Sequence, residues 1–351
     1  MSLFPTALEM RSRALADLRL GLPIIIDMPQ PLMVCAAETL TNDRLEGFRE
    51  LGEVHGVISK WRADTLKINV YDGDLARLKI PNVVDSSWCR AVADPISDLS
   101  HPMKGPFKTL RGGSVKGQRL AISLLKAAQM LPMAIIVQTS KNLKNLTKIA
   151  YFDDLKPNYY NVVSAALPLE VSESCRLHVF RPNSAGDEHY ALEIGTPERS
   201  LPVLTRLHSA CFTGDILGSL KCDCGPQLES ALAQMGKERA GILLYLNQEG
   251  RGIGLANKMR AYALQGQGFD TVDANHRLGF EDDERDFQIG AELLKRLGFM
   301  SIRLMTNNPN KVARLQGQGV QVTERVPLIV GDTLQNRDYL RTKAEKSGHL
   351  L

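Results

Sequence analysis

Three cysteines in one short stretch place the strongest constraint on how this chain can fold. Cys211, Cys222 and Cys224 follow the spacing C-x10-C-x-C. If Cys222 and Cys224 lie in an extended segment, both side chains point to one face, and Cys211 must reach them from a neighbouring segment. Three thiolates at one point suit a zinc ion, and three protein ligands with one open position are typical of catalytic zinc. The alternative is a group of buried, inert cysteines.

The composition indicates a globular protein that is long enough for two domains. Its 351 residues are 44% hydrophobic and 23% charged. The net charge of +4 suits an anionic small ligand and does not call for nucleic acid. Six cysteines, half of them in one cluster, favour a reducing compartment over a disulfide framework. The N-terminus has no apolar signal core and no run of 18 apolar residues occurs, so we predict a cytoplasmic protein without a membrane partner.

The order of predicted elements indicates an α/β protein with mixed sheets and helices. In the first half, helical and strand patterns alternate over residues 7–20, 21–27, 32–38, 42–52, 113–131 and 133–138. In the second half, the pattern predicts an antiparallel pair at 177–180 and 190–194, strands at 201–209, 241–246 and 301–306, and helices at 227–239 and 255–265. We predict a first domain over residues 1–165, a linker over 166–175 and a second domain over 176–351.

Two segments of the second half have the pattern of anion sites. A glycine-rich turn at 248–254 lies between a strand and a helix, where backbone N–H groups and Arg251 can approach phosphate oxygens. Asn308 can cap a helix that has Pro309 at its first position, which places Lys311 in the first turn. A tight turn without a ligand is the alternative for the first segment.

An acidic run at 281–286 surrounds Arg285, and a tyrosine precedes it at position 262. Such a run is typical of a solvated helix start, because acidic residues favour helix N-termini. Near zinc, a guanidinium held among carboxylates could instead handle protons. Tyr262 lies among apolar neighbours and could equally be a core tyrosine.

Residues 176–351 resemble GTP cyclohydrolase II, a zinc enzyme of riboflavin biosynthesis. The shared motifs occur in family order: His208-Ser-Ala-Cys-Phe-Thr-Gly-Asp215, Ser219-Leu-Lys-Cys-Asp-Cys-Gly-Pro-Gln-Leu228, Tyr245-Leu-Asn-Gln-Glu-Gly-Arg-Gly-Ile-Gly-Leu255, Arg260-Ala-Tyr-Ala-Leu264, Glu284-Arg-Asp-Phe287, Thr306-Asn-Asn-Pro309 and Glu324-Arg-Val-Pro327. The resemblance implies hydrolysis of GTP to 2,5-diamino-6-(5-phosphoribosylamino)pyrimidin-4(3H)-one, formate and pyrophosphate. It also implies a homodimer with one Zn²⁺ per subunit and Mg²⁺ on the substrate triphosphate.

The resemblance further implies a role for individual residues. Cys211, Cys222 and Cys224 would bind zinc. Arg285 matches the arginine that attacks the α-phosphorus and expels pyrophosphate, and Asp283 matches its proton acceptor. Tyr262 matches the tyrosine near the reacting purine. The positions that contact GTP would be Arg206, Leu207, His208, Ser209, Ala210, Gln227, Glu249, Gly250, Arg251, Thr271, Thr306 and Lys311.

One position departs from the family pattern. Where the family usually has glutamate before the first cysteine, this chain has Ala210. The lost carboxylate adjoins the expected metal site, which bears on the rate or on the product. Three hypotheses therefore stay open: an active GTP cyclohydrolase II, a related ring-opening hydrolase of another pathway such as pyrimidine breakdown, and a non-catalytic paralogue that binds GTP and releases no formate.

The first half resembles the 3,4-dihydroxy-2-butanone 4-phosphate synthase domain in the order of its pieces: Ile24-Ile-Ile-Asp27, Val34-Cys-Ala-Ala-Glu38, His101-Pro, Gly105-Pro-Phe107, Arg111-Gly-Gly-Ser-Val-Lys-Gly117 and Leu131-Pro-Met-Ala-Ile-Ile-Val137. That family has an acidic run after its first strand and a later metal-binding histidine motif. The loop at 28–32 has no carboxylate here, and 114–117 has no histidine. Without such ligands a hard divalent cation is poorly held. The sequence predicts a domain that keeps the synthase fold and has lost the reaction.

Overall fold

A computed structural model describes residues 3–141, 143–152, 155–348 and 350. The chain forms two compact units, and each combines a β-sheet with helices, which confirms the predicted fold class. The first unit contains Met1–Lys156 and Ala256–Glu284, and the second contains Pro157–Leu255 and Arg285–Leu351. The chain thus passes from one unit to the other three times, after Lys156, Leu255 and Glu284. The sequence analysis predicted a single boundary near residue 165.

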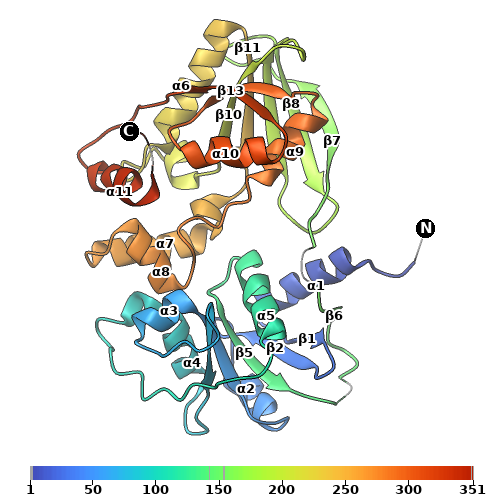
Figure 1. Ribbon diagram of the computed structural model, residues 1–351, viewed down its shortest axis with the longest axis vertical. Coiled ribbons are helices and arrows are strands. Elements are labelled where there is room, and N and C mark those ends of the chain that lie inside the picture. Colours follow the sequence, from blue (N-terminus) through green and yellow to red (C-terminus); the bar gives the residue numbers. More distant parts are fainter. Residues whose placement is uncertain (1–2, 142, 153–154, 349, 351) are drawn as a thin grey trace. The chain divides into compact units, whose positions relative to one another are not determined.

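The first unit has a six-stranded sheet in the order β4-β3-β5-β2-β1-β6 (Figure 1). The strands are β1 (Ile24–Asp27), β2 (Leu32–Ala36), β3 (His55–Ser59), β4 (Leu75–Lys79), β5 (Met133–Gln138) and β6 (Lys148–Ala150). All neighbours are antiparallel except β1 and β6, which are parallel. The helices from this part of the chain are α1 (Ala7–Arg19), α2 (Asn42–Arg49), α3 (Lys60–Thr65), α4 (Ser86–Ala93), the 3-10 turn η1 (Pro95–Ser97) and α5 (Lys116–Ala127).

Helices α1 and α5 pack on this sheet and close the core of the first unit. α1 begins at a complete capping box, in which the Thr6 hydroxyl accepts from Glu9 N and Glu9 accepts from Thr6 N. Its buried residues Leu15 and Leu18 join Ile24, Val34 and Ile136 of the sheet in one cluster. Burial of this apolar surface is the main force that holds the two helices against the sheet.

The first unit also contains α7 (Leu255–Gly266) and α8 (Thr271–Leu278), which the sequence analysis assigned to the second domain. Helix α8 packs against α3. Arg260 of α7 forms ion pairs with Glu38 and Asp94 at 2.9 and 3.1 Å. Gly279 ends α8 in the left-handed conformation, and a Cβ there would lie 2.8 Å from Pro132. These contacts join residues that lie far apart in the sequence, so local patterns could not reveal them.

The second unit has a seven-stranded sheet in the order β13-β12-β10-β11-β9-β8-β7 (Figure 1). The strands are β7 (Tyr159–Ala166), β8 (Cys175–Pro182), β9 (His189–Gly195), β10 (Val203–Ser209), β11 (Ala240–Leu246), β12 (Ser301–Met305) and β13 (Gln321–Val326). Strands β10 to β13 are mutually parallel, and β9, β8 and β7 follow antiparallel. The helical elements are η2 (Phe212–Ile216), α6 (Cys224–Glu238), η3 (Glu249–Gly252), α9 (Gln288–Arg296), α10 (Pro309–Gly317) and α11 (Arg337–Ser347).

The antiparallel pair β8–β9 confirms the predicted pair, whereas the predicted linker is wrong. Strands β7 and β8 form a hairpin in which Ala166 pairs with Arg176, and Leu167 N donates to Cys175 O at 2.9 Å. Residues 166–175 are therefore the end of that hairpin. Residues at both ends of this segment join the sheet because their backbone N–H and C=O groups form hydrogen bonds within it.

The central strands of the second unit are buried on both faces, as is usual for parallel strands covered by helices. One cluster contains Leu207, Leu244 and Leu304 with residues of α9 and α10, and the other contains Leu204 and Leu243 with residues of α6. The carboxyl ends of β10, β11 and β12 lie at one edge of the sheet, because the strands are parallel and adjacent. In open α/β sheets, ligands bind at this edge.

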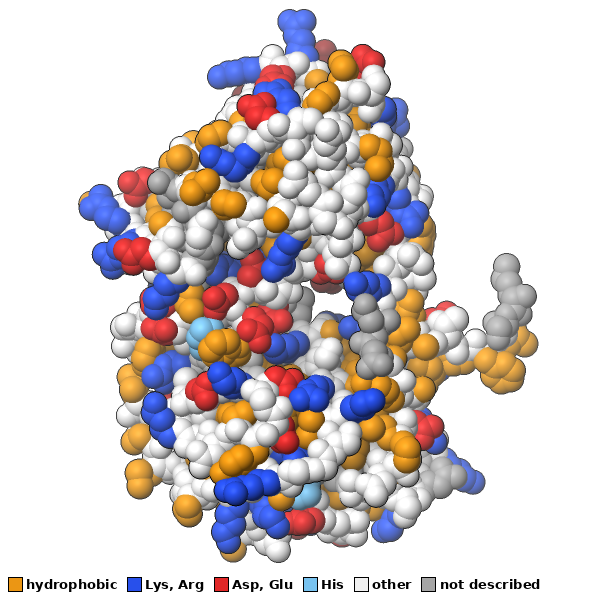
Figure 2. All heavy atoms as spheres, viewed as in Figure 1, with side chains coloured by type: hydrophobic (Ala, Val, Ile, Leu, Met, Phe, Trp, Pro, Cys, Tyr) orange, Lys and Arg blue, Asp and Glu red, His pale blue; other side chains and the backbone are white. Residues whose placement is uncertain are grey.

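On the surface, basic and acidic side chains are interspersed over the visible face of each unit (Figure 2). Among the described residues, no helix is both long and apolar enough to span a membrane.

Candidate functional site

The three cysteines of the sequence motif converge at the carboxyl edge of the second sheet. Their sulfur atoms all lie within 4.8 Å of one another, and those of Cys211 and Cys222 are 3.7 Å apart. Among the described residues they form the one group of three or more His, Cys, Asp or Glu side chains that could hold a metal ion. The convergence is as predicted, but Cys224 begins α6 and does not continue an extended segment.

The chemistry of the donors and the space around them fit a zinc ion. Thiolates are soft ligands that suit Zn²⁺, and three of them leave one coordination position open. Hydrogen bonding with Cys211 raises the pKa of Cys222 and Cys224 above that of an isolated thiol. A divalent cation reverses this effect, because it binds the thiolates and displaces their protons.

Gly214 leaves the space that the sulfur atoms need. A Cβ at this position would lie 2.8 Å from Cys222 Sγ, 2.9 Å from Cys224 Cβ and 3.0 Å from Cys211 Sγ. We expect Gly214→Ala to lower zinc affinity about 10- to 100-fold, the range seen when the surroundings of metal ligands are altered. Zinc content after dialysis against a chelator checks this. Gly317→Ala is the control, because nothing lies within 4 Å of a Cβ there; equal zinc retention in both variants would contradict the prediction.

The buried carboxylate of Asp215 connects residues 211–215 to the sheet. Asp215 accepts hydrogen bonds from His208 Nε2 at 3.0 Å, from Cys211 N at 3.0 Å and from the Tyr245 hydroxyl at 2.9 Å. Burial lowers the pKa of His208 and raises that of Tyr245. Because His208 Nε2 donates to Asp215, Nδ1 is the acceptor nitrogen, and it is buried without a hydrogen-bond partner in the described structure.

A second buried chain of polar groups joins β10 to α6. Arg206 donates to Gln227 Oε1 and, at 3.1 Å, to Met305 O. Gln227 in turn donates to Asp223 at 2.6 Å. Burial lowers the pKa of Arg206 to about 10. The chain orients Arg206 and Gln227 beside Cys224, the neighbour of Asp223 in the sequence.

The glycine-rich turn after β11 is linked by hydrogen bonds to Phe212, next to Cys211, and to Asp286 of the acidic run. Gly250 and Arg251 adopt left-handed conformations, with φ of 63° and 61°. Glu249 accepts a hydrogen bond from Phe212 N at 2.6 Å. Gln248 forms a reciprocal pair with Asp286: its amide donates to Asp286 O at 2.9 Å and accepts from Asp286 N at 2.8 Å. This pair fixes the chain next to Arg285.

Three basic side chains surround the ring of Phe287 in the second unit. The guanidinium carbons of Arg285 and Arg314 and Nζ of Lys311 lie 5.0, 5.2 and 5.2 Å from the ring centre. Arg285 also donates to Ser209 Oγ at 3.3 Å, and Lys311 Nζ donates to Leu207 O at 3.2 Å. The cluster has the charge that a polyphosphate requires.

Comparison with known proteins identifies the family. A family model for GTP cyclohydrolase II matches residues 160–327. GTP cyclohydrolase-2 of Azospirillum brasilense is 38% identical to this chain, over 98% of the chain and 94% of that protein. This chain belongs to the GTP cyclohydrolase II family. Membership makes it a hydrolase of the GTP cyclohydrolase II class.

Other relatives align with about half of this chain. GTP cyclohydrolase-2 of Azotobacter vinelandii is 58% identical over 50% of this chain and 84% of that protein. Riboflavin biosynthesis protein RibBA of Bacillus mycoides is 59% identical over 47% of this chain and 41% of that protein; its name connects the family with riboflavin biosynthesis. The solved RibBX, a two-domain 3,4-dihydroxy-2-butanone 4-phosphate synthase from A. baumannii, aligns over 90% of this chain and 99% of that chain, with 16% identity and a TM-score of 0.31. A TM-score this low supports no argument about the first unit.

The structure divides the predicted cyclohydrolase residues between the two units. The second unit holds the cysteines, Arg285 and most expected GTP contacts: Arg206, Leu207, His208, Ser209, Ala210, Gln227, Glu249, Gly250, Arg251, Thr306 and Lys311. The first unit holds Tyr262, Thr271 and Asp283. The predicted cap at Asn308 is confirmed, since its side chain accepts from Asn310 N at 2.9 Å. The acidic run lies in a segment before α9 and is not part of that helix.

Several supporting residues of the cyclohydrolase site were not singled out from the sequence. Asp215, Tyr245 and Asp223 all contact predicted site residues or their neighbours. A signal for Tyr245 was present, because it is a side chain with a polar tip within an otherwise apolar strand. Leu207 was predicted to contact GTP, but its side chain lies in the core, which leaves its carbonyl as the group at the site.

A buried histidine next to the glycine-rich turn predicts acid sensitivity of the cyclohydrolase unit. Burial lowers the pKa of His189 from 6.5 to about 4, and its Nδ1 accepts from Asn247 N at 3.0 Å, which requires the neutral ring. The unfolded chain binds this proton below about pH 6.5, so stability falls as the pH drops toward 4. Between pH 7.5 and 5 we expect the parent to lose about 2 kcal/mol more unfolding free energy than His189→Asn. Urea titrations at both pH values check this; equal losses would contradict it.

Proposed function

We propose that the protein is a zinc-dependent GTP cyclohydrolase II. It would hydrolyse GTP to 2,5-diamino-6-(5-phosphoribosylamino)pyrimidin-4(3H)-one, formate and pyrophosphate, at the first step of riboflavin biosynthesis. The observation that carries the proposal is the convergence of Cys211, Cys222 and Cys224 at the carboxyl edge of the sheet, in a chain that belongs to this family. When bound, zinc supplies a Lewis acid and lowers the pKa of water at its open position toward about 7.

The remaining predicted site residues have complementary tasks in this proposal. The basic cluster of Arg285, Lys311 and Arg314 would take the triphosphate, with Mg²⁺ neutralising part of its charge. The unpartnered Nδ1 of His208 is an acceptor for a donor on the substrate. Arg285 would attack the α-phosphorus, with Asp283 as its proton acceptor and Tyr262 near the purine; these roles rest on the family resemblance. The homodimer and the cytoplasmic location belong to the same proposal.

The N-terminal part of the first unit, residues 1–156, carries out no synthase reaction in this proposal. A cavity of about 710 Å³ there is lined by Met28, Gln30 and Ser114, from the two segments where the synthase resemblance expects acidic and histidine ligands. Asp27 also lines this cavity and pairs with Lys148 at 3.2 Å. Neither of these two segments supplies a carboxylate or an imidazole to the cavity, which supports the proposed loss of the synthase reaction.

The test is release of formate and pyrophosphate from GTP by the full-length protein supplied with Zn²⁺ and Mg²⁺. Release of both in equal amounts, with a chelator of Zn²⁺ suppressing formate, supports the proposal. GTP binding without formate would favour the non-catalytic paralogue. Inert GTP with turnover of a pyrimidine substrate would favour the ring-opening hydrolase of another pathway. Pyrophosphate without formate would assign the loss of ring opening to the Ala210 departure.

A further inference from the structure

We infer that Trp61 and Lys126 of the first unit position the catalytic Asp283. The inference rests on the proposed function and adds to it a task for a unit that has lost its own reaction. Asp283 lies in the loop at 281–284, which has no regular secondary structure. Such a loop keeps its place through its contacts, and several of these are made with elements of the first unit.

Trp61, on α3, contacts this loop directly through its indole N–H and indirectly through its ring. Its indole ring stacks on His276 of α8, with ring centres 3.7 Å apart and an angle of 4° between the planes. Its Nε1 donates to Glu281 at 2.8 Å. His276 in turn contacts Asp282 at 2.6 Å. The two residues before Asp283 are therefore held, one directly and one through the stacked ring.

Lys126, at the end of α5, holds the residue on the other side. Its Nζ forms an ion pair with Glu284 at 2.6 Å, and both side chains are largely buried. The same Glu284 oxygen accepts from Glu281 N at 2.9 Å, which closes the loop on itself. Asp283 is thus flanked on both sides by residues fixed from α3 and α5, and Arg285 follows two positions later in the chain.

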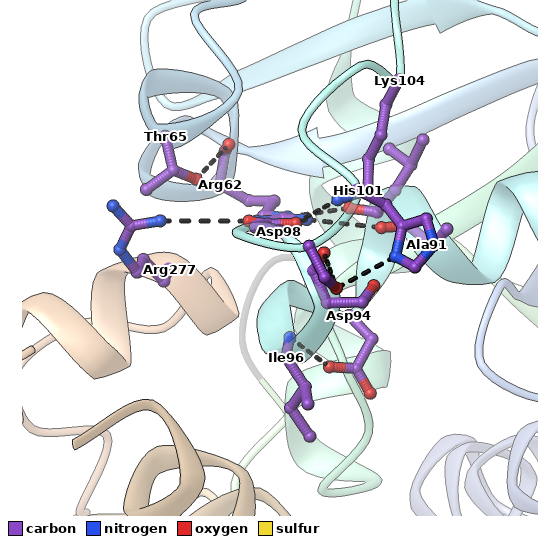
Figure 3. A network of polar contacts seen from close by, with 12 residues as sticks. Arg62, Thr65, Ala91, Asp94, Ile96, Asp98, His101, Lys104 and Arg277 are labelled. Carbon is purple, nitrogen blue, oxygen red and sulfur yellow. Dashed lines mark hydrogen bonds and ion pairs between the residues drawn. The ribbon is translucent and has the colours of Figure 1, made fainter. Parts of the chain in front are cut away.

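The helix that leads into the loop is anchored by a separate charge network (Figure 3). Asp98 accepts two hydrogen bonds from the buried Arg62, also binds Lys104, and lies 4.0 Å from Arg277 of α8. Because Arg62 and Trp61 are adjacent on α3, the helix contributes to both anchors. The loop therefore starts from a fixed helix, and the contacts of Trp61 and Lys126 hold its backbone in position.

A small displacement of a catalytic group lowers turnover strongly, by about 100-fold for roughly 1 Å. We expect Trp61→Ala and Lys126→Met to lower kcat for formate and pyrophosphate release about 10- to 100-fold. KM for GTP and zinc content should change little, since the basic cluster and the cysteines belong to the second unit. Trp61→Phe keeps a ring for stacking but loses the donor to Glu281, so its effect should be smaller. Lys126→Arg keeps the ion pair and should retain most activity.

The experiment is a double-mutant cycle in the full-length protein between Trp61→Ala and Asp283→Asn. If Trp61 acts through Asp283, Trp61→Ala should lower kcat by less than about threefold in the Asp283→Asn background. The reason is that the effects of coupled residues do not add. Lys79→Met is the control: Lys79 lies on β4 of the first unit, and its Nζ pairs with Glu53 at 2.6 Å, an ion pair that shares no residue with the loop or with the Asp98 network. Its kcat should stay at the parental value.

Parental kcat in folded Trp61→Ala and Lys126→Met would overturn the inference, and so would full additivity with Asp283→Asn. If Trp61→Ala does not fold, Trp61→Phe and Lys126→Met decide by the same criteria. Failure of the proposed function is distinguishable, because the parent protein itself would then release no formate.

Discussion

Replacing Cys222 with serine should abolish formate release from GTP and remove the bound zinc. Cys222 is buried and its sulfur lies 3.7 Å from that of Cys211, so it forms part of the centre of the cluster. A serine hydroxyl is a harder and far less acidic ligand, and the two remaining thiolates hold zinc poorly. Formate release should fall by about 1,000-fold or more, since even changes beyond the metal ligands cost 10- to 100-fold.

The measurements are zinc content and formate release for parent and variant side by side. Cys175→Ser is the matched control, because Cys175 is a buried cysteine of the same unit whose sulfur donates to Ser172 O. It should keep its zinc and its activity. A Cys222→Ser protein with full zinc and parental formate release would show that the cluster is not the catalytic centre.

Replacing Arg285 with lysine should suppress release of both products and leave zinc bound. The family resemblance places this guanidinium at the α-phosphorus, and the structure holds it between Ser209 Oγ and the ring of Phe287. Lysine keeps the charge but lacks the planar group with several donors, so the geometry at the phosphate is lost. We expect kcat to fall about 100- to 1,000-fold, the usual cost of removing a group that stabilises the transition state.

Arg314→Lys tests whether the loss of kcat is specific to the guanidinium of Arg285. Arg314 lies over the same ring at 5.2 Å and donates to Arg285 O. Because the resemblance gives it no role at the phosphorus, its kcat should stay within about threefold of the parent. Parental kcat in both variants would mean that the cluster acts through its charge alone, and equal losses would mean that both guanidinium groups are needed.

The sequence predicted what depends on neighbours along the chain. The cysteine spacing revealed a real cluster, because a strand end, a short helix and a helix start follow within a few residues. The Asn308 cap with Pro309 at the next position was also predicted, since capping is a local preference. These features need no knowledge of the rest of the fold.

The placement of α7 and α8 could not be predicted in the same way. The sequence predicted a helix at 255–265 and none at 271–278, and the unit of both α7 and α8 is set by single contacts such as Arg260 with Glu38 and Trp61 with His276. Those pairs lie more than 200 residues apart in the sequence and leave no periodic signal. The predicted linker failed for a related reason, because a polar segment can equally be the end of a hairpin.

The course of the chain, which leaves the second unit after Leu255 and returns at Arg285, has an evolutionary consequence. A domain without a reaction is ordinarily free to decay or to be deleted. Here a deletion of the first 156 residues would remove Glu38, Trp61 and Lys126, which contact α7, α8 and the loop at 281–284. Under the proposed function, selection for cyclohydrolase turnover would act on these residues of the first unit, and the two halves of the chain would be inherited as one functional unit.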